Sequence, residues 1–425
     1  MPNSARNPSG PRRLVSPWYL AYLVLGLINS GMLPFLLPLA VARAGYGLGG
    51  IAYVIGAYNF GLMPAPLLGV LAERQRLFRP VFFYGFIALA VPLAVLPELS
   101  GLLSWVGIAM LVGCGSGAVA TVAPLFVVDF APKEEWESRI GWLQSFNGAG
   151  QLIGLLLAGA VAEGNLAHGF WIAAACAAAA IIVGQFGLPV EERRRTDRPP
   201  RLAWRDLMET FHPAPAVGGL LQQSHHLQDA AWRRLPDAFG GAFGRFVLAW
   251  AMFNLSVAPF FAYYPLLMKE TYAVAPTTTA LLYALAACIG IGVFPLAGWL
   301  ARGYGPRFVF RLGLGLRLIG FAALAMLVVL PGAPRGLPFA ALGFVVIMLA
   351  WPVLSVSGTD LAARLTPIGE GAAMGLLAAS TAAATVIGTF LGGPLVAAFG
   401  YNVVLPIALV GLISAEALAA SSHRG

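Results

Sequence analysis

The stretch GVLAERQRLFRPV, residues 69–81, carries Glu73 and three arginines within seven residues, between two long apolar runs. The stretch GWLARGYGPRFV, residues 298–309, reads as an incomplete copy of it. A short basic connection between apolar runs is typical of a cytoplasmic loop between two membrane helices. We therefore expect one such hinge in each half of a duplicated membrane protein.

The composition excludes an ordinary soluble chain. Hydrophobic residues make up 59% of the sequence, charged residues 10%, and the mean hydropathy is +0.79. A soluble globular protein carries roughly 25% charged residues. The apolar runs reach about 20 residues, the length of a helix that crosses a bilayer, whereas barrel strands would be about 10 residues long. The sequence thus predicts an all-α integral membrane protein.

The apolar runs predict twelve transmembrane helices in two pseudo-symmetric six-helix bundles. The expected order is a cytoplasmic tail at 1–16, an N-terminal bundle at 17–188, a cytoplasmic linker at 189–243, a C-terminal bundle at 244–420 and a tail at 421–425. The expected spans are 17–42, 48–72, 80–97, 101–128, 140–162 and 168–188, then 244–268, 277–301, 306–330, 337–359, 369–396 and 400–420. The first run has no obvious cleavage site, so we interpret it as a retained helix.

The basic residues predict the orientation. With both termini in the cytoplasm, the inside segments hold 23 Lys and Arg residues, and the outside segments hold only Arg43, Lys269 and Arg335. Without the nine cations of the linker the ratio is still 14 to 3. This positive-inside bias predicts that both termini are cytoplasmic. We expect a multi-pass protein of the cytoplasmic (inner) membrane of a prokaryote.

Several function classes lack the residues they need. The net charge of +8 comes from cations that flank the spans, so we expect no nucleic-acid partner. The three cysteines fall in different spans without metal-ligand spacing, and the histidines lie in loops or tails. The sequence has no nucleophile pattern and no phosphate-binding loop. We therefore expect a protein that is not an enzyme and that needs no cofactor, metal or ATP.

The two halves carry matching residues in the same order. Three glycines repeat at a constant offset of 234, and Asp129 in VVDFAP faces Asp360 in GTDLAA at an offset of 231. The matching glycines are Gly141, Gly154 and Gly159 with Gly375, Gly388 and Gly393. A duplicated bundle implies an approximate twofold axis along the membrane normal and a shared interface. Rocking the halves about that interface would expose a ligand to each side in turn.

The loop GVLAER, followed by basic residues between the second and third spans, resembles the signature G-x-L-a-D-R-x-G-R-R of the major facilitator superfamily. The second copy keeps Gly298 and Arg307. LGGPLVAAFGYNVVLPIAL, residues 391–409, is similar to that family's join between its last two spans. The resemblance covers about 17–420 and implies a secondary transporter that works by alternating access.

The resemblance also implies a latch at the cytoplasmic loop that begins at Gly69. Glu73 would face a helix end or a basic partner when the cytoplasmic side closes, and Arg74 would pair with Asp129. In the second copy Arg302 stands where the acid is expected, which weakens that latch. The alternative is that these arginines only fix the topology.

Two features that are common in the proton-coupled drug exporters of this superfamily are missing. The fourth span, MLVGCGSGAVA at 110–120, has no arginine, and the G-x-x-x-G of the fifth span is not followed by proline. Proton coupling and the direction of transport are therefore left open. Gly150, Gly154, Gly388 and Gly392 are expected to let membrane helices pack closely.

The spans are poor in charge, and Arg317, about two turns from the cytoplasmic end of the ninth span, is expected to snorkel to the interface. A charged solute would then lack a counter-ion, so we expect a neutral or amphipathic organic solute. Candidate cavity residues are the uncharged polar and aromatic side chains of the spans: Asn29, Asn59, Gln144, Asn147, Gln151, Asn254, Tyr263, Tyr264 and Trp351. The alternative for the amides is a purely structural role in which they hydrogen-bond one another between helices.

Together these features predict a monomeric secondary transporter or facilitator that binds a small molecule, with or without a coupling ion, in the lipid bilayer. A different class of protein is the alternative. A chain of this architecture that no longer transports could assist the assembly of a membrane complex or pigment. Flux in liposomes would separate the two.

Overall fold

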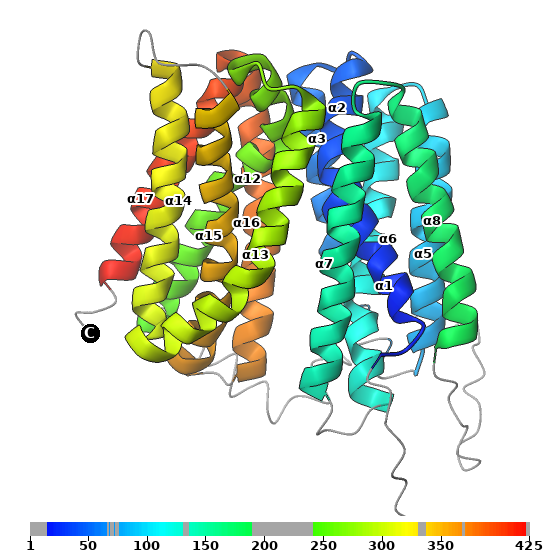
Figure 1. Ribbon diagram of the computed structural model, residues 1–425, viewed down its shortest axis with the longest axis horizontal. Coiled ribbons are helices and arrows are strands. Elements are labelled where there is room, and N and C mark those ends of the chain that lie inside the picture. The colour runs from blue at the N-terminus through cyan, green and yellow to red at the C-terminus, as the bar shows by residue number, and fades with distance from the viewer. Residues whose placement is uncertain are drawn as a thin grey trace, which may run out of the picture.

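The computed structural model describes residues 15–65, 68, 72, 76–130, 136–188, 241–329, 337–367 and 370–421. These residues form helices and connecting turns, without a β-strand among them. The helices stand side by side in two bundles, one from each half of the sequence (Figure 1). The predicted all-α membrane fold is confirmed, and most of the central linker lies outside the described residues.

Each bundle consists of six successive membrane-crossing segments. The first contains α1 (Tyr19–Gly26), η1 (Leu27–Met32) and α2 (Leu33–Arg43) as one segment, then α3 (Gly47–Leu62), α5 (Phe78–Val95) with η2 (Leu96–Glu98), α6 (Leu102–Phe130), α7 (Trp136–Val161) and α8 (Leu166–Gly187). The second contains α12 (Ala242–Tyr272), α13 (Pro276–Tyr304), α14 (Pro306–Val329), α15 (Leu337–Leu365), α16 (Glu370–Phe399), η4 (Tyr401–Val403) and α17 (Val404–Ser421). Ten of these segments are long and apolar enough to cross a membrane. The others are α3, described over 16 residues, and α7, whose amides make it the least apolar of the long helices.

The first segment is not a uniform α-helix. Its middle part, η1, is a π-helical turn, and Pro34 follows directly in the first turn of α2. Proline has no N–H group, so the carbonyl of Ser30 loses its ordinary partner four residues ahead. A π turn at this position redistributes the backbone hydrogen bonds, and such turns are frequent at functional sites.

Glycines bring pairs of helices into backbone contact in both bundles. In the first bundle, Gly150 and Gly154 of α7 lie against the backbone carbonyls of Leu23 and Leu27. A Cβ atom at either glycine would collide with those carbonyls. The corresponding contact in the second bundle joins Gly388 of α16 to the backbone of α12. Small residues thus set the spacing of the α1–α7 and α12–α16 pairs.

Gly392 extends the second of these contacts. A Cβ atom at Gly392 would lie 2.6 Å from the ring of Pro259 in α12. Nearer the start of both helices, Trp250 of α12 donates its indole N–H to the hydroxyl of Thr381 of α16 at 2.7 Å. Steric fit and one hydrogen bond therefore hold α12 and α16 together.

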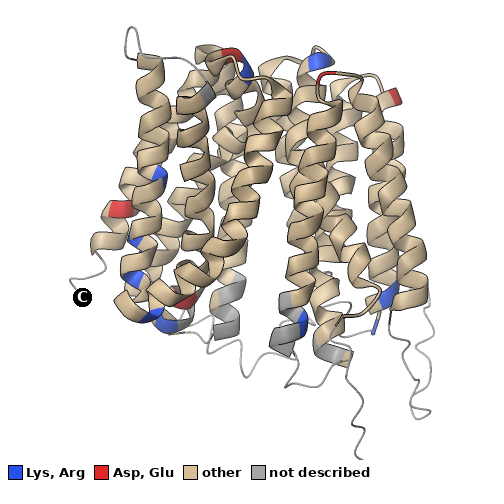
Figure 2. Ribbon diagram, in the orientation of Figure 1, with Lys and Arg blue, Asp and Glu red and all other residues tan. Residues whose placement is uncertain are grey.

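The helix ends divide into two groups by charge (Figure 2). We call the end at which α1 and α12 begin the lower end, and the opposite end, where α2 and α12 finish, the upper end (Figure 1). The described cations gather at the lower end, which includes Arg79, Arg302, Arg307 and Arg364. The upper end holds both signs: Arg43, Glu98, Glu163, Lys269 and Glu270.

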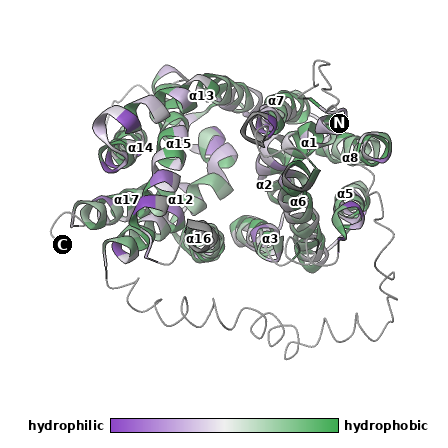
Figure 3. Cartoon of the chain, turned by 90° about the horizontal axis from the view of Figure 1, so that it is seen from below, coloured by the Kyte–Doolittle hydropathy of each residue, from purple (hydrophilic) through white to green (hydrophobic). Residues whose placement is uncertain are grey.

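The two bundles meet along two helix pairs. α3 of the first bundle packs against α16 of the second, and α7 packs against α13. Viewed from below, these pairs lie on opposite sides of the molecule, with α2 and α12 between them (Figure 3). The two contacts are related by the same exchange of halves, because each joins the second segment of one bundle to the fifth of the other. We call this interface the seam.

Candidate substrate site between the two bundles

The α3–α16 side of the seam is closed at the upper end by apolar and aromatic contacts. The ring of Phe390 lies against Gly56, where a Cβ atom would come within 2.7 Å of it. Gly393 lies against Ala52 with no room for a side chain. Next to this contact, Tyr263 of α12 donates its hydroxyl proton to the carbonyl oxygen of Leu48 at 2.6 Å.

The α7–α13 side of the seam is closed by polar groups. The hydroxyl of Thr277, in the first turn of α13, lies 3.1 Å from the carbonyl oxygen of Gly159 and 2.9 Å from Oε1 of Glu163. With one proton, the hydroxyl donates to one of these acceptors at a time. Gly159 also makes room for Ala280, whose Cβ would be 2.9 Å from a Cβ added to the glycine.

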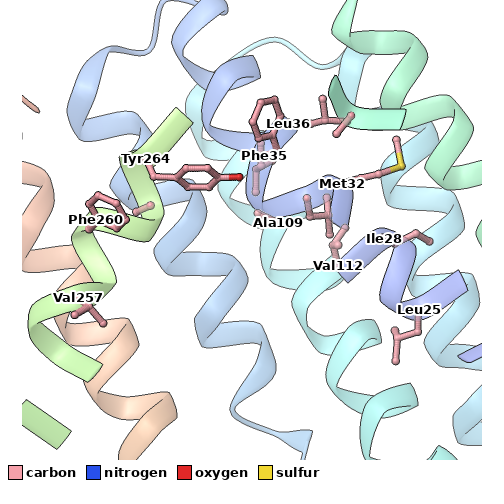
Figure 4. Close-up of a cluster of buried hydrophobic side chains, with 14 of the residues drawn as sticks. Leu25, Ile28, Met32, Phe35, Leu36, Ala109, Val112, Val257, Phe260 and Tyr264 are labelled. Carbon is pink, nitrogen blue, oxygen red and sulfur yellow. The ribbon is translucent and has the colours of Figure 1, made fainter. Parts of the chain in front are cut away.

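Figure 4 shows buried apolar side chains of α1, η1, α2 and α6 inside the first bundle, with those of α12 facing them from the second bundle. Tyr264 points from α12 across the seam toward Phe35 of α2, with ring centroids 6.0 Å apart (Figure 4). On its other face it stacks on Phe344 at 5.6 Å. Its hydroxyl is buried and has no hydrogen-bond partner in the described part of the chain.

The seam contacts described above all lie at the upper end or the centre. Toward the lower end the ribbons of the two bundles separate, most visibly between α7 and α13 (Figure 1). This arrangement corresponds to a molecule closed at the upper end.

Asn29, one of the predicted cavity residues, lies in the π turn η1 and is half-buried. Its Oδ1 atom is buried and accepts no hydrogen bond from the described residues. A buried amide oxygen without a partner is unfavourable by about 1–3 kcal/mol. Such an atom is available to a hydroxyl or N–H group of a solute.

The three predicted amides of α7 lie beside the glycines that contact the first segment. Gln144 is exposed, and its side chain lies near the hydroxyl of Tyr22 in α1. Asn147 and Gln151 are half-buried, and their backbone carbonyls contact Gly26 and Gly31, respectively. The α1–η1–α7 contact therefore brings Asn29 and the amide stripe into one region. The proximity of Gln144 to Tyr22 is of the interhelical kind that the structural alternative predicts.

The other predicted cavity residues are distributed over both bundles. Asn59 is half-buried in α3. Asn254 is buried, and its Nδ2 donates to the carbonyl oxygen of Trp250 one turn earlier at 2.8 Å, so it is satisfied within α12. Trp351 of α15 is 39% exposed and stands 6.3 Å from the ring of Trp250. Tyr263 and Tyr264 belong to the upper and central parts of the seam.

The first latch falls largely outside the described residues. Gly69, Glu73 and Arg74 are not described, and Asp129 lies in the last turn of α6 with its side chain outside the description. The latch between Arg74 and Asp129 therefore stays a prediction.

The second copy of the loop is described. Gly298 is half-buried in α13, Arg302 is exposed in its last turn, and Arg307 is the second residue of α14. Between these helices Gly305 adopts a φ of +86°, a conformation that favours glycine and turns the chain sharply. The Asp360 carboxylate accepts a hydrogen bond from Nε of Arg364 in the same helix at 2.7 Å. The acidic residue of this half is thus engaged locally.

The expectation that Arg317 snorkels to the interface is wrong. Its side chain is only 2% exposed, and its guanidinium group lies among aromatic rings of α12 and α15. The helix face decides the outcome, because Gly313 and Gly320 share that face and both pack against α15. The pattern G-x-x-x-R-x-x-G was the sequence signal that could have placed Arg317 inside the bundle.

An ion pair between α14 and α17 was not predicted from the sequence either. Arg311 of α14 donates from Nε to Oε1 of Glu416 in α17 at 2.6 Å. The pair joins two neighbouring helices on the outside of the second bundle. Pairing of this kind allows charges to lie within apolar segments.

Two duplicated six-helix bundles that meet along a seam define a membrane transporter. Residues 18–367 match the model of the Major Facilitator Superfamily. The chain belongs to this family, which confirms the resemblance of the GVLAER loop.

Solved transporter structures share the fold. The nucleoside transporter NupG is 12% identical with a TM-score of 0.71, covering 96% of this chain and 97% of its own. A D-xylose-proton symporter is 16% identical with a TM-score of 0.66, covering 93% and 95%. A bacterial homologue of the iron transporter ferroportin in an inward-facing state is 16% identical with a TM-score of 0.68, covering 96% and 98%. The comparison with curated proteins gives no match.

Proposed function

We propose that the protein is a secondary transporter or facilitator that moves a small organic solute across the cytoplasmic membrane by alternating access. The main supporting observation is the seam, where the contacts described above join the bundles at the upper end and the centre while the helices diverge toward the lower end. Rocking the bundles about a central site would exchange one open end for the other. The protein would act as a monomer, with or without a coupling ion.

Side chains of the first segment and of α12 support an amphipathic organic solute. Among the described residues, the buried Oδ1 of Asn29 and the buried hydroxyl of Tyr264 have no hydrogen-bond partner, and aromatic rings surround Tyr264. Hydrogen-bonding groups set in apolar walls are the usual composition of small-molecule sites. The preference for a neutral solute rested on spans without buried charge, and Arg317 removes that reason.

The charge distribution supports an orientation with the lower end in the cytoplasm and both termini inside. Cations of the described segments concentrate at the lower end, as the positive-inside rule predicts for cytoplasmic loops. In this orientation the conformation is closed to the outside. The ferroportin homologue, whose structure is described as inward-facing, has a similar fold.

Flux measurements in liposomes test the transport proposal. Purified protein would be reconstituted and assayed with a panel of labelled nucleosides, sugars, amino acids and organic acids. We expect counterflow of at least one solute, and a large loss of its flux in Asn29→Leu and Gln151→Leu. Gln185→Leu, an exposed amide of the outer helix α8, is the matched control.

The outcomes separate the alternatives. Flux that is equal in all three variants and the parent would show that the amides are structural. No flux across the panel, together with co-purification of a membrane complex, would overturn the proposal in favour of an assembly role.

The cytoplasmic latch has a separate test. Arg74→Ala and Asp129→Ala would each shift the balance between open and closed lower ends, measured by cysteine accessibility. If the two side chains pair, the double variant resembles the single variants. Additive effects would remove the latch.

A further inference from the structure

Arg317 is a buried cation with no acidic partner among the described residues. Its side chain is 2% exposed in the middle part of α14. Arg311, Arg364 and Lys269 each pair with a carboxylate, whereas no acid in the described part of the chain interacts with Arg317. An unpaired charge within a membrane protein is costly, and such residues are usually retained for ligands or ions.

Aromatic rings enclose the guanidinium group. Its Cζ atom lies 4.9 Å from the ring centroid of Phe253, 5.4 Å from that of Phe261 and 5.9 Å from that of Trp351. Ring faces attract a cation, which compensates part of the loss of water. Tyr283 of α13 is also near enough to interact with the charge. The group is therefore held in a collar contributed by α12, α13 and α15.

Most of the hydrogen-bonding capacity of Arg317 is unused. Nε donates to the backbone carbonyl of Ile347 at 3.3 Å. The two terminal nitrogens, which carry four N–H groups, make no hydrogen bond to the described part of the chain. Cation–π contacts do not satisfy these donors in the way an oxygen acceptor does.

We propose that Arg317 binds the carboxylate group of an amphipathic monoanion, with the apolar body of the ligand against Trp351. This inference rests on the proposed transport function and names its substrate class. The guanidinium fork matches a carboxylate in a bidentate geometry. One cation balances one negative charge, which favours a monocarboxylate over a doubly charged phosphate.

The collar has an accessible side. Trp351 is 39% exposed although its ring lies beside the buried guanidinium group. Its neighbour Trp250 is buried and fixed to α16 by the bond to Thr381. The exposed side of Trp351 is the route by which a solute would reach the Arg317 site, with Trp250 as the deeper wall.

Equilibrium binding to the full chain in detergent tests the site. The probes are benzoate, phenylacetate and octanoate, each with its uncharged amide as a matched ligand. We expect the carboxylates to change tryptophan fluorescence and raise the melting temperature, and the amides to bind at least about tenfold more weakly, the range expected for charge-assisted hydrogen bonds.

Three variants test whether Arg317 is responsible for the carboxylate binding. Arg317→Gln should lose carboxylate binding by about tenfold or more, and Arg317→Lys should recover part of it because it keeps the charge without the fork. Arg311→Gln, in the same helix but paired with Glu416, is the control and should bind like the parent. Equal affinity for carboxylates and amides, or unchanged binding in Arg317→Gln, overturns the proposal.

Stability gives a readout that does not depend on the ligand. If the cation is kept for a ligand, Arg317→Met should melt at the same or a higher temperature than the parent without ligand, since it removes a buried charge. A lower melting temperature in Arg317→Met, combined with no carboxylate binding in the parent, would mean that Arg317 only holds the helices together.

Binding and transport can fail separately. Carboxylate binding that requires Arg317, without flux in liposomes, supports the site and contradicts transport. Flux of uncharged solutes without carboxylate binding supports transport and contradicts the site.

Discussion

The two bundles share their packing and differ in their chemistry. In the first, Gly150 and Gly154 place α7 against the backbone of the first segment. In the second, Gly388 and Gly392 place α16 against α12. The first contact is bordered by amides, whereas the second bundle carries aromatic rings around the buried Arg317.

The comparison of the two bundles shows which positions of a duplicated bundle can change and which must stay glycine. Backbone-to-backbone contact leaves no space for a Cβ atom, so the glycines must remain in both copies. Side chains that face the inside are limited only by hydrogen bonding and charge, so each half can acquire its own binding groups. A solute held at the seam would meet neutral amides on one side and a cation on the other.

The largest expected effect comes from filling the shared contact. Gly154→Val and Gly388→Val each push a side chain into a carbonyl of the facing helix. We expect each to lower stability by about 3 kcal/mol, the upper range for overpacking, and to reduce the yield of folded protein. Melting in detergent, followed by fluorescence size-exclusion, measures both.

A glycine with free space provides the control. Gly148 lies in α7 on the side of the amide stripe away from Gly150 and Gly154, and, apart from its chain neighbours and the backbone of its own helix, no described atom lies within 4 Å of a Cβ added to it. Gly148→Val should melt close to the parent. A similar loss in all three variants would show that β-branched residues, rather than the contact, destabilise these helices.

The next effect compares the two sides of the seam. Tyr263→Phe removes the hydrogen bond to Leu48 on the α3–α16 side. A buried hydrogen bond contributes about 1 kcal/mol, so the population open at the upper end should rise about fivefold. Spin-label distances between the upper ends of α3 and α16 measure the shift. An unchanged distance distribution would contradict a role in closure.

A smaller shift is expected on the polar side. Thr277→Val removes the donor to Gly159 and Glu163, but the bond to Glu163 is exposed and exchanges readily with water. We expect the free energy of opening at the upper end to fall by less than about 1 kcal/mol, measured from distances between spin labels on α7 and α13. An effect larger than that of Tyr263→Phe would reverse the ranking of the two sides.

The smallest effect concerns the second copy of the loop. Arg364→Ala removes an exposed pair with Asp360 within one helix. Such pairs contribute little, so the opening equilibrium and the melting temperature should not change measurably. A clear shift in lower-end accessibility would instead give Asp360 a latch function in the second half.

Much of the fold could be predicted from the sequence. Apolar runs of bilayer length and the loop GVLAER gave the helical membrane class and the family, because both depend on local composition. The position of Arg317 could not be predicted from depth alone. Whether a long cation snorkels or turns inward depends on which helix face meets a neighbour, and that is a tertiary property.

The polar site was predicted only in outline. The i, i+3, i+7 spacing placed three amides on one side of α7, and the structure brings them near Asn29. The neighbours of the polar side chains were not predictable: Gln144 of α7 lies near Tyr22, and Asn254 of α12 hydrogen-bonds its own helix. The π turn at η1 was not predicted either, since it arises from backbone hydrogen bonds around Pro34 rather than from a hydrophobic period.

Arg43, at the end of α2, ties the first bundle together in a second place. It donates to the carbonyl oxygens of Gly164, at 2.6 Å, and Ala162, just beyond the end of α7. With the glycine contact farther down, the first and fifth segments are fastened at two separate heights. We therefore expect these two segments to rotate together as one rigid body, so that a probe fixed to either of them reports the same angular displacement during a transport cycle.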